Sequence, residues 1–132
     1  MLVQLTYVST PRVPFSAGDV ATLLAAARTA NARRNVTGLL LYDGVRFLQV
    51  LEGAPADVDA LVERIRNDGR HHALVVLSRK PIDARHFSEW AMAYRDARDD
   101  RDLAAVVAPL VEGADASTRA LFESFARLRR AA

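Results

Sequence analysis

The sequence predicts an α+β fold of the ferredoxin-like type, a βαββαβ sandwich with one more strand and with C-terminal helices on the opposite face of the sheet. Short segments rich in β-branched and aliphatic residues alternate with longer segments whose apolar residues recur at helical spacing. Their order is strand, helix, strand, strand, helix, strand, strand. The length of 132 residues fits one compact domain with a short extension. We expect the domain over residues 1–98 and a helical extension over residues 99–132.

The first strand is expected over residues 2–9, where side chains alternate between two faces. Leu5 and Tyr7 share one of these faces. Pro11 and Pro14 then break the pattern and predict a turn.

A helix is expected from about residue 17 to residue 33. Ser16, with Asp19 three positions later, resembles a capping box in which Asp replaces the usual Glu. The apolar residues at i, i+3, i+4 and i+7 predict its buried stripe: Val20, Leu23, Leu24 and Ala27. Small residues elsewhere on this helix would let a flat group lie close to it, or they reflect only the abundance of alanine in this chain: Ala21, Ala25, Ala26 and Ala30.

Two further strands are expected over residues 36–42 and 45–52. Asp43-Gly44 between them is a strong signal for a type I′ hairpin. Gln49 stands on the second of these strands among apolar neighbours. A buried carboxamide must find hydrogen-bond partners, because an unpaired one costs on the order of 1–3 kcal/mol.

The second half of the domain follows the same alternation. A helix is expected over about residues 55–68 and a fourth strand over residues 73–77. The last strand is expected over residues 89–95, with Trp90 and Met92 on one face.

Two amphipathic stripes, at residues 103–110 and 121–128, predict helices near the C-terminus. The sheet face that the first two helices leave open carries too much apolar surface to remain in water: Leu2, Val8, Leu48 and Val50. We expect the extension to cover this face, within one chain or between chains, and we therefore expect a homo-oligomer.

Composition excludes several classes of function. The chain has no cysteine, which excludes disulfides, thiolate catalysis and cysteine-ligated metals. Its net charge of +2 comes from interspersed acidic and basic residues, which argues against a nucleic-acid partner. No apolar run is long enough to span a membrane and no secretory leader opens the chain, so we expect a cytoplasmic protein. The chain carries no dinucleotide, phosphate-loop or hydrolase fingerprint and no histidine pair with metalloprotease spacing, so we expect neither an enzyme nor a metal site.

Two carboxamides are the candidate ligand-binding groups. Asn31 stands at the expected end of the first helix and Gln49 on the strand that follows. Each alone is more often a helix cap or a buried amide paired with backbone. Their convergence suggests a flat ligand with donors and acceptors along its edge.

Segments 30–38 and 49–53, taken with Tyr7 and with Trp90-Ala91-Met92, resemble the BLUF family of flavin-binding blue-light sensors. The resemblance covers about residues 1–98. It implies non-covalent binding of FAD, with the flavin ring between the two helices. FMN or riboflavin could replace FAD, since the ring edge is what these residues contact.

The resemblance also implies roles for three residues. Tyr7 would give an electron and a proton to the photoexcited flavin. Gln49 would lie between Tyr7 and the N5/O4 edge of the ring and would switch its hydrogen bonds. Turning its amide over, or changing its tautomer, exchanges donor for acceptor. Asn31 would hold the C4 carbonyl and the N3 side of the ring.

The resemblance bears on six further positions. His71, preceded by Arg70, would contact the pyrimidine edge, although an exposed histidine is an equal alternative. Trp90 and Met92 would carry the signal out of the pocket. Arg28 lies one turn before Asn31 and could reach a phosphate, although a solvated arginine is the alternative. Ala30 stands where some members carry a polar residue, which leaves part of the phosphate binding unexplained.

The sequence therefore predicts a small blue-light photoreceptor that signals to a downstream protein partner. Two alternatives remain open. A flavin-dependent reductase could use the same pocket, and a ligand-free ferredoxin-like interaction module would make all these residues structural.

Overall fold

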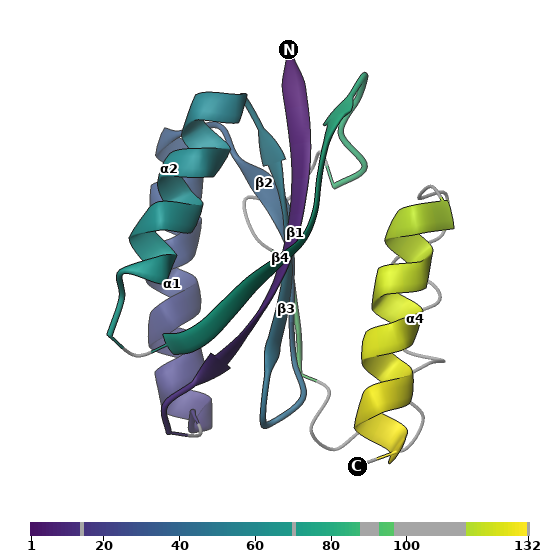
Figure 1. The fold of residues 1–132 in the computed structure, drawn as a ribbon. Coiled ribbons are helices and arrows are strands. Elements are labelled where there is room, and N and C mark those ends of the chain that lie inside the picture. The colour runs from purple at the N-terminus through teal and green to yellow at the C-terminus, as the bar shows by residue number, and fades with distance from the viewer. Residues whose placement is uncertain (14, 70, 88–92, 97–115, 132) are drawn as a thin grey trace.

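The computed structural model describes residues 1–13, 15–69, 71–87, 93–96 and 116–131. Its centre is a five-stranded sheet in the order β4-β1-β3-β2-β5 (Figure 1). In this sheet β5 runs parallel to β2, and the other neighbouring strands are antiparallel. The strands are β1 (Leu2–Pro11), β2 (Thr37–Tyr42), β3 (Phe47–Gly53), β4 (His71–Ile82) and β5 (Ala93–Asp96).

Helices α1 (Ala17–Arg33) and α2 (Pro55–Arg66) cover one face of the sheet, and α4 (Ala116–Ala131) lies along the other (Figure 1). This arrangement confirms the α+β sandwich predicted from the sequence. The expected helix over residues 103–110 lies outside the described residues.

Local sequence explains where α1 begins and ends. Ser16 accepts a hydrogen bond from the Asp19 backbone and the Asp19 carboxylate accepts one from the Ser16 backbone, so the expected capping box is present. The helix ends at Arg33, and Asn35, with φ of 54°, turns the chain toward β2. The capping box and the turn at Asn35 thus set the two ends of α1.

The hairpin between β2 and β3 is longer than the sequence predicts. Asp43 Oδ1 accepts hydrogen bonds from the backbone N–H groups of Val45 and Arg46. The carboxylate therefore organises a four-residue loop, whereas the Asp43-Gly44 signal predicted a two-residue turn. Val45 consequently lies in the loop, not in the strand, and is exposed.

Other boundaries also differ from the expected ones. β1 continues to Pro11, because β4 extends over His71–Ile82 and pairs with it there, far beyond the expected residues 73–77. For the last strand, the structure describes Ala93–Asp96, and the expected residues 89–92 lie outside the described part of the chain.

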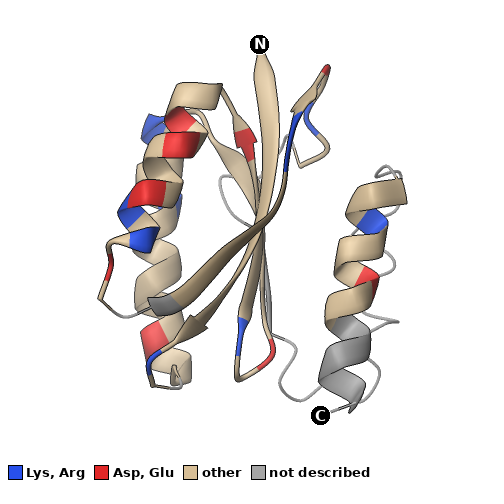
Figure 2. Cartoon of the chain, viewed as in Figure 1, with Lys and Arg blue, Asp and Glu red and all other residues tan. Residues whose placement is uncertain are grey.

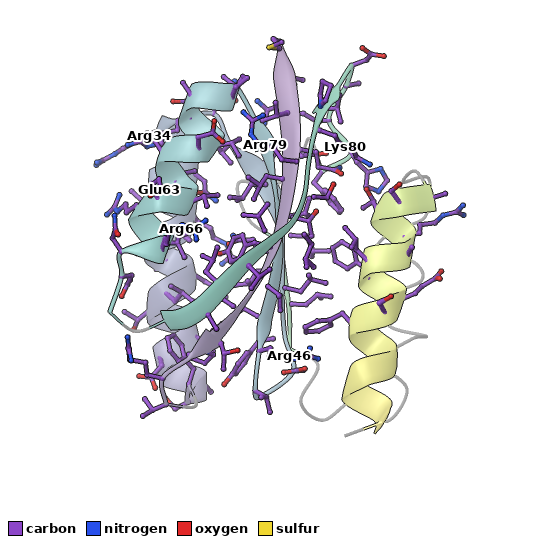
Figure 3. The ribbon with its side chains drawn as sticks, viewed as in Figure 1. Arg34, Arg46, Glu63, Arg66, Arg79 and Lys80 are labelled. Atoms are coloured by element: carbon purple, nitrogen blue, oxygen red, sulfur yellow. The ribbon has the colours of Figure 1, made fainter. Side chains whose placement is uncertain are left out.

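The two sheet faces have separate interiors. Beneath α1 and α2 the core is apolar and includes residues from both helices and from four strands: Val3, Leu5, Tyr7, Val20, Leu24, Leu40, Leu51, Val58, Leu61 and, partly buried, Leu74. On the side of α4 the side chains fill the space between helix and sheet (Figure 3). The buried residues there come from alternate positions of β2 and β3 and from α4: Leu39, Leu41, Leu48, Val50, Phe122 and Phe125.

Acidic residues lie along the first turns of α2, and the arginines Arg64 and Arg66 lie in its last turn (Figure 2). Arg79 on β4 forms a bidentate ion pair with Asp59 on α2, at 3.0 and 2.9 Å. No helix among the described residues is long and apolar enough to cross a membrane.

Candidate functional site

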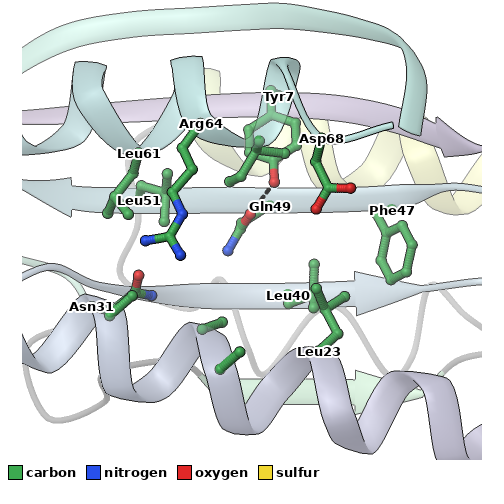
Figure 4. Close-up of a pocket in the computed structure, with 14 residues that line it drawn as sticks. Tyr7, Leu23, Asn31, Leu40, Phe47, Gln49, Leu51, Leu61, Arg64 and Asp68 are labelled. Atoms are coloured by element: carbon green, nitrogen blue, oxygen red, sulfur yellow. Dashed lines mark hydrogen bonds between the residues drawn. The ribbon is translucent and has the colours of Figure 1, made fainter. Parts of the chain in front are cut away.

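A cavity of about 150 Å³ lies between α1, α2 and the sheet (Figure 4). Its walls come from α1, α2 and strands β1, β2 and β3, so it occupies the centre of the sandwich. Apolar side chains make up most of its lining: Leu23, Ala26, Ala27, Ala30, Leu40, Phe47, Leu51, Leu61 and Ile65. Five polar groups complete it: Tyr7, Asn31, Gln49, Arg64 and Asp68.

Small side chains on α1 create this space. Ala26, Ala27 and Ala30 form the part of the wall that belongs to the helix, together with Leu23. Larger residues at these positions would fill the gap between α1 and the sheet. Of the four alanines expected to admit a flat group, Ala26 and Ala30 line the cavity, whereas Ala21 and Ala25 are exposed and do not.

Tyr7 and Gln49 are direct cross-strand partners on β1 and β3. The Tyr7 hydroxyl donates a hydrogen bond to Oε1 of Gln49 (Figure 4). Both side chains are at most 5 % exposed and both line the cavity. Burial raises the pKa of the Tyr7 hydroxyl above its ordinary value of 10.0, so the phenol keeps its proton at neutral pH.

Asn31 occupies the last turn of α1 and points into the cavity from the opposite wall (Figure 4). Its side chain is 3 % exposed. Its backbone carbonyl accepts hydrogen bonds from Arg34 and Val36, at 3.2 and 2.9 Å. The end of the helix and the start of β2 thus hold Asn31 at a fixed height above the sheet.

Arg64 and Asp68 line the same cavity and were missed by the sequence analysis. Arg64 extends from α2 into the space between the helices (Figure 4). The spacing in the sequence could have indicated the position of Arg64. Arg64 lies on the same side of α2 as Leu61 and Ile65, which belong to the apolar stripe that faces the sheet. Charged residues near the end of a surface helix are usually solvated, which is why the pattern alone did not single them out.

The other predicted site residues either lie outside the cavity lining or are not fully described by the structure. Arg28 is exposed on α1 and is absent from the cavity lining. His71 belongs to β4, where its backbone pairs with Pro11, and its side chain is not described. Arg70, Trp90 and Met92 lie outside the described residues.

This arrangement suits a planar heteroaromatic ligand. The apolar walls would contact its faces, while Asn31 and Gln49 offer carboxamide donors and acceptors to its edge. Tyr7 is positioned to pass its hydroxyl proton to Gln49, because the two groups already share a hydrogen bond. The cavity therefore brings together apolar walls, a buried phenol and two carboxamides.

Comparison with known proteins identifies relatives of this chain. The family model described as sensors of blue light using FAD, BLUF, matches residues 2–93. The alpha subunit of photoactivated adenylate cyclase from Euglena gracilis is 40 % identical over 84 residues, which are 64 % of this chain and 8 % of that protein. The match thus covers less than a tenth of that relative.

Solved structures give the same result over nearly the whole chain. The dark-state structure of BlrB, a BLUF protein, has a TM-score of 0.76 and 34 % identity, covering 96 % of each chain. A bacterial light-regulated adenylyl cyclase has a TM-score of 0.76 and 27 % identity, covering 99 % of this chain and 36 % of that one.

Proposed function

The chain belongs to the BLUF family of sensors of blue light using FAD, and from this we propose that Tyr7 and Gln49 are its photoactive pair. The hydrogen bond between the Tyr7 hydroxyl and Gln49 Oε1, at the wall of the cavity, carries the proposal. A family model covering residues 2–93 supports flavin as the ligand of that cavity.

The residues present fit the isoalloxazine ring of FAD. The alanines of α1 and the leucines of the sheet and α2 provide apolar contacts for its two faces. Asn31 and Gln49 provide the polar contacts along its edge. Arg64 and Asp68 lie on the α2 side of the cavity, where they can contact the polar chain attached to the ring. His71 and Arg70 remain proposed contacts to the pyrimidine edge, and Arg28 a proposed phosphate contact.

Bound FAD would supply the absorption of blue light and, once excited, an acceptor for an electron from a nearby phenol. Tyr7 is the donor, and its proton moves along the existing hydrogen bond to Gln49 Oε1. Gln49 then turns over or changes tautomer, so that its amide presents the opposite donor and acceptor pattern. When the electron and the proton have both returned to Tyr7, Tyr7 and Gln49 would be left with an altered hydrogen bond, which is the proposed signalling state.

Burial makes this chemistry depend on a single acceptor. Tyr7 is buried and its hydroxyl already donates to Gln49, so the proton would go to that contact rather than to solvent. Gln49 is that acceptor. Its position opposite Tyr7 in the strand register makes the transfer short and repeatable.

The absorption spectrum before and after blue light tests the proposal. Purified protein should be yellow and should show a reversible red shift on illumination. Tyr7→Phe should keep the flavin and lose the shift entirely, because the ring survives and the transferable proton does not. Tyr42→Phe is the matched control: Tyr42 is also buried, but its hydroxyl bonds Phe15 and Gly44 and it does not line the cavity.

The outcomes separate the alternatives. A normal red shift in Tyr7→Phe would contradict the proposed mechanism. Colourless protein without affinity for flavin would support the interaction module, and turnover of reduced nicotinamide would support the reductase.

We also propose that the signal leaves through contact with another protein. Two of the proteins compared above are named as cyclases, and this chain matches only a part of each, whereas BlrB is matched over 96 % of both chains. α4 covers the sheet face away from the cavity and is the described element available to a partner or to a second copy (Figure 1). Light scattering coupled to gel filtration should show a homo-oligomer, and truncation after Arg98 should change its size.

A further inference from the structure

A second hydrogen-bonded pair joins β1 to β3, on the face opposite the cavity. Gln4 and Glu52 are cross-strand partners, and Gln4 Nε2 donates to Glu52 Oε2 at 2.9 Å. They stand three positions from Tyr7 and Gln49 on the same two strands, so the alternation of a strand places them on the other face. Gln4 is 5 % exposed and Glu52 is fully buried.

Glu52 collects hydrogen bonds from the segment that follows β4. Its carboxylate accepts from the backbone N–H groups of His86 and Phe87, at 3.1 and 2.7 Å. Its own backbone carbonyl accepts from the guanidinium of Arg85 at 2.7 Å. One residue of β3 therefore fixes three consecutive residues of this segment.

Gln4 extends the same network to α4. Its Oε1 accepts a hydrogen bond from Thr118 Oγ1 at 2.9 Å. Thr118 Oγ1 in turn accepts from Nζ of Lys80 on β4, at 3.2 Å. Lys80 lies on the side of the sheet that faces α4 (Figure 3).

The chemistry of these groups fixes their polarity. A carboxylate only accepts hydrogen bonds, so the amide of Gln4 must direct its NH₂ group to Glu52. Its oxygen must then face Thr118, which has to donate. A movement of β3 against β1 would break this chain of bonds in a dry interior, where unpaired polar groups are costly.

We propose that the Glu52–Gln4–Thr118 network couples the strand pair beneath the cavity to the docking of α4. This inference rests on the proposed function, because the light-driven change at Tyr7 and Gln49 acts on the same two strands. Two steps separate the Tyr7–Gln49 pair from α4. The first runs along β1 or β3 to Gln4 and Glu52. The second is the hydrogen-bonded set of side chains from Glu52 through Gln4 to Thr118.

Hydrogen exchange in the dark and under blue light, on the full chain with FAD, tests this coupling. In the parent protein, illumination should change exchange of the α4 amides around Phe122 by roughly fivefold or more. Thr118→Val keeps the shape of the side chain and removes its hydroxyl. It should keep the red shift and reduce the light-dependent change in α4 to less than about twofold.

Thr6→Val is the matched control. Thr6 lies on the same face of β1, is 1 % exposed, and its hydroxyl has no hydrogen-bond partner among the described residues. The same substitution there should leave both the red shift and the light-dependent exchange of α4 at parent values. Glu52→Gln is a second probe: it keeps the volume, disturbs the polarity of the network, and should raise exchange of α4 already in the dark.

The results distinguish failure of the coupling from failure of the proposed function. A parent protein with a red shift but without a light-dependent change in α4 would overturn the coupling alone. So would a Thr118→Val protein whose α4 responds as the parent does. A parent protein without a red shift would overturn the function on which the coupling rests.

Discussion

The two faces of the β1–β3 strand pair are built in opposite ways. Facing α1 and α2, Tyr7 and Gln49 form one hydrogen bond beside a cavity lined by alanine and leucine. Facing α4, Gln4 and Glu52 belong to a network that reaches the segment before β5 and the first turns of α4.

The difference shows how one pair of strands can serve two purposes. An amide beside a cavity has room to exchange its donor and acceptor. An amide between a carboxylate and a threonine hydroxyl has one orientation only, because its partners dictate it. The first arrangement is suited to switching and the second to reporting the position of the strands.

Gln49→Leu and Gln4→Leu compare the two amides directly. We expect the light-induced red shift to be absent in the first variant and retained in the second. Gln49→Leu should bind flavin and lose the light-induced red shift, because leucine cannot exchange donor for acceptor. Gln4→Leu should retain the shift, although it leaves Glu52 short of one partner and should lower the free energy of unfolding by about 1–3 kcal/mol. Absorption spectra and urea unfolding measure both effects. A red shift in Gln49→Leu would show that this amide does not switch.

Filling the cavity should be the next largest effect. Ala27→Leu places three extra carbons in the wall of the cavity and should weaken flavin binding by about ten- to a hundredfold, from an overpacking cost of roughly 1–3 kcal/mol. Ala25→Leu is the control, since Ala25 is exposed on α1 and does not line the cavity. Titration of the flavin-free proteins with FAD gives both affinities. Equal affinities would mean that the ring does not lie against α1.

The residues on the cavity face of the sheet were largely predictable from the sequence, and the hydrogen-bonded network on the α4 face was not. Gln49 could be picked out as an amide among apolar strand neighbours and Asn31 as an amide at the expected end of a helix, whereas Tyr7 was singled out by the family resemblance. Resemblance to a family then added what each would do. Arg64 and Asp68 were missed because charged residues on a surface helix give no such contrast.

The network on the other face gives no local signal. Gln4 and Glu52 are separated by 48 positions, and Gln4 and Thr118 by 114. From the sequence alone, a polar residue near the end of a strand is expected to be exposed to solvent. Gln4 lies opposite Glu52 only because of the register between β1 and β3. The hairpin length was mispredicted for a related reason, because the Asp43 side chain supplies hydrogen bonds that the two-residue turn signal does not include.

Asn31→Ala should have a smaller effect on binding than a filled cavity. It removes one edge contact and should weaken flavin affinity by about tenfold, the equivalent of roughly 1.4 kcal/mol. Asn67→Ala is the control, because Asn67 is an exposed amide at the C-terminal cap of α2 and lies outside the cavity lining. An unchanged affinity and spectrum in Asn31→Ala would count against the placement of the ring edge.

The smallest effect expected comes from the buried phenol, and it appears only at high pH. The folded-state pKa of Tyr7 is raised above its ordinary value of 10.0 by burial, so the folded protein keeps this proton while the unfolded chain loses it. Tyr7 therefore contributes stability that is fully present below pH 10 and is lost as the pH rises further. At pH 10.5 the loss should be roughly 0.8 kcal/mol relative to pH 8. Urea unfolding of the flavin-free parent and of Tyr7→Phe at both pH values isolates this contribution, since the other titrating groups are shared. An equal loss in the two proteins would show that Tyr7 ionises as readily when folded as when unfolded, and that its proton is not confined to the bond with Gln49.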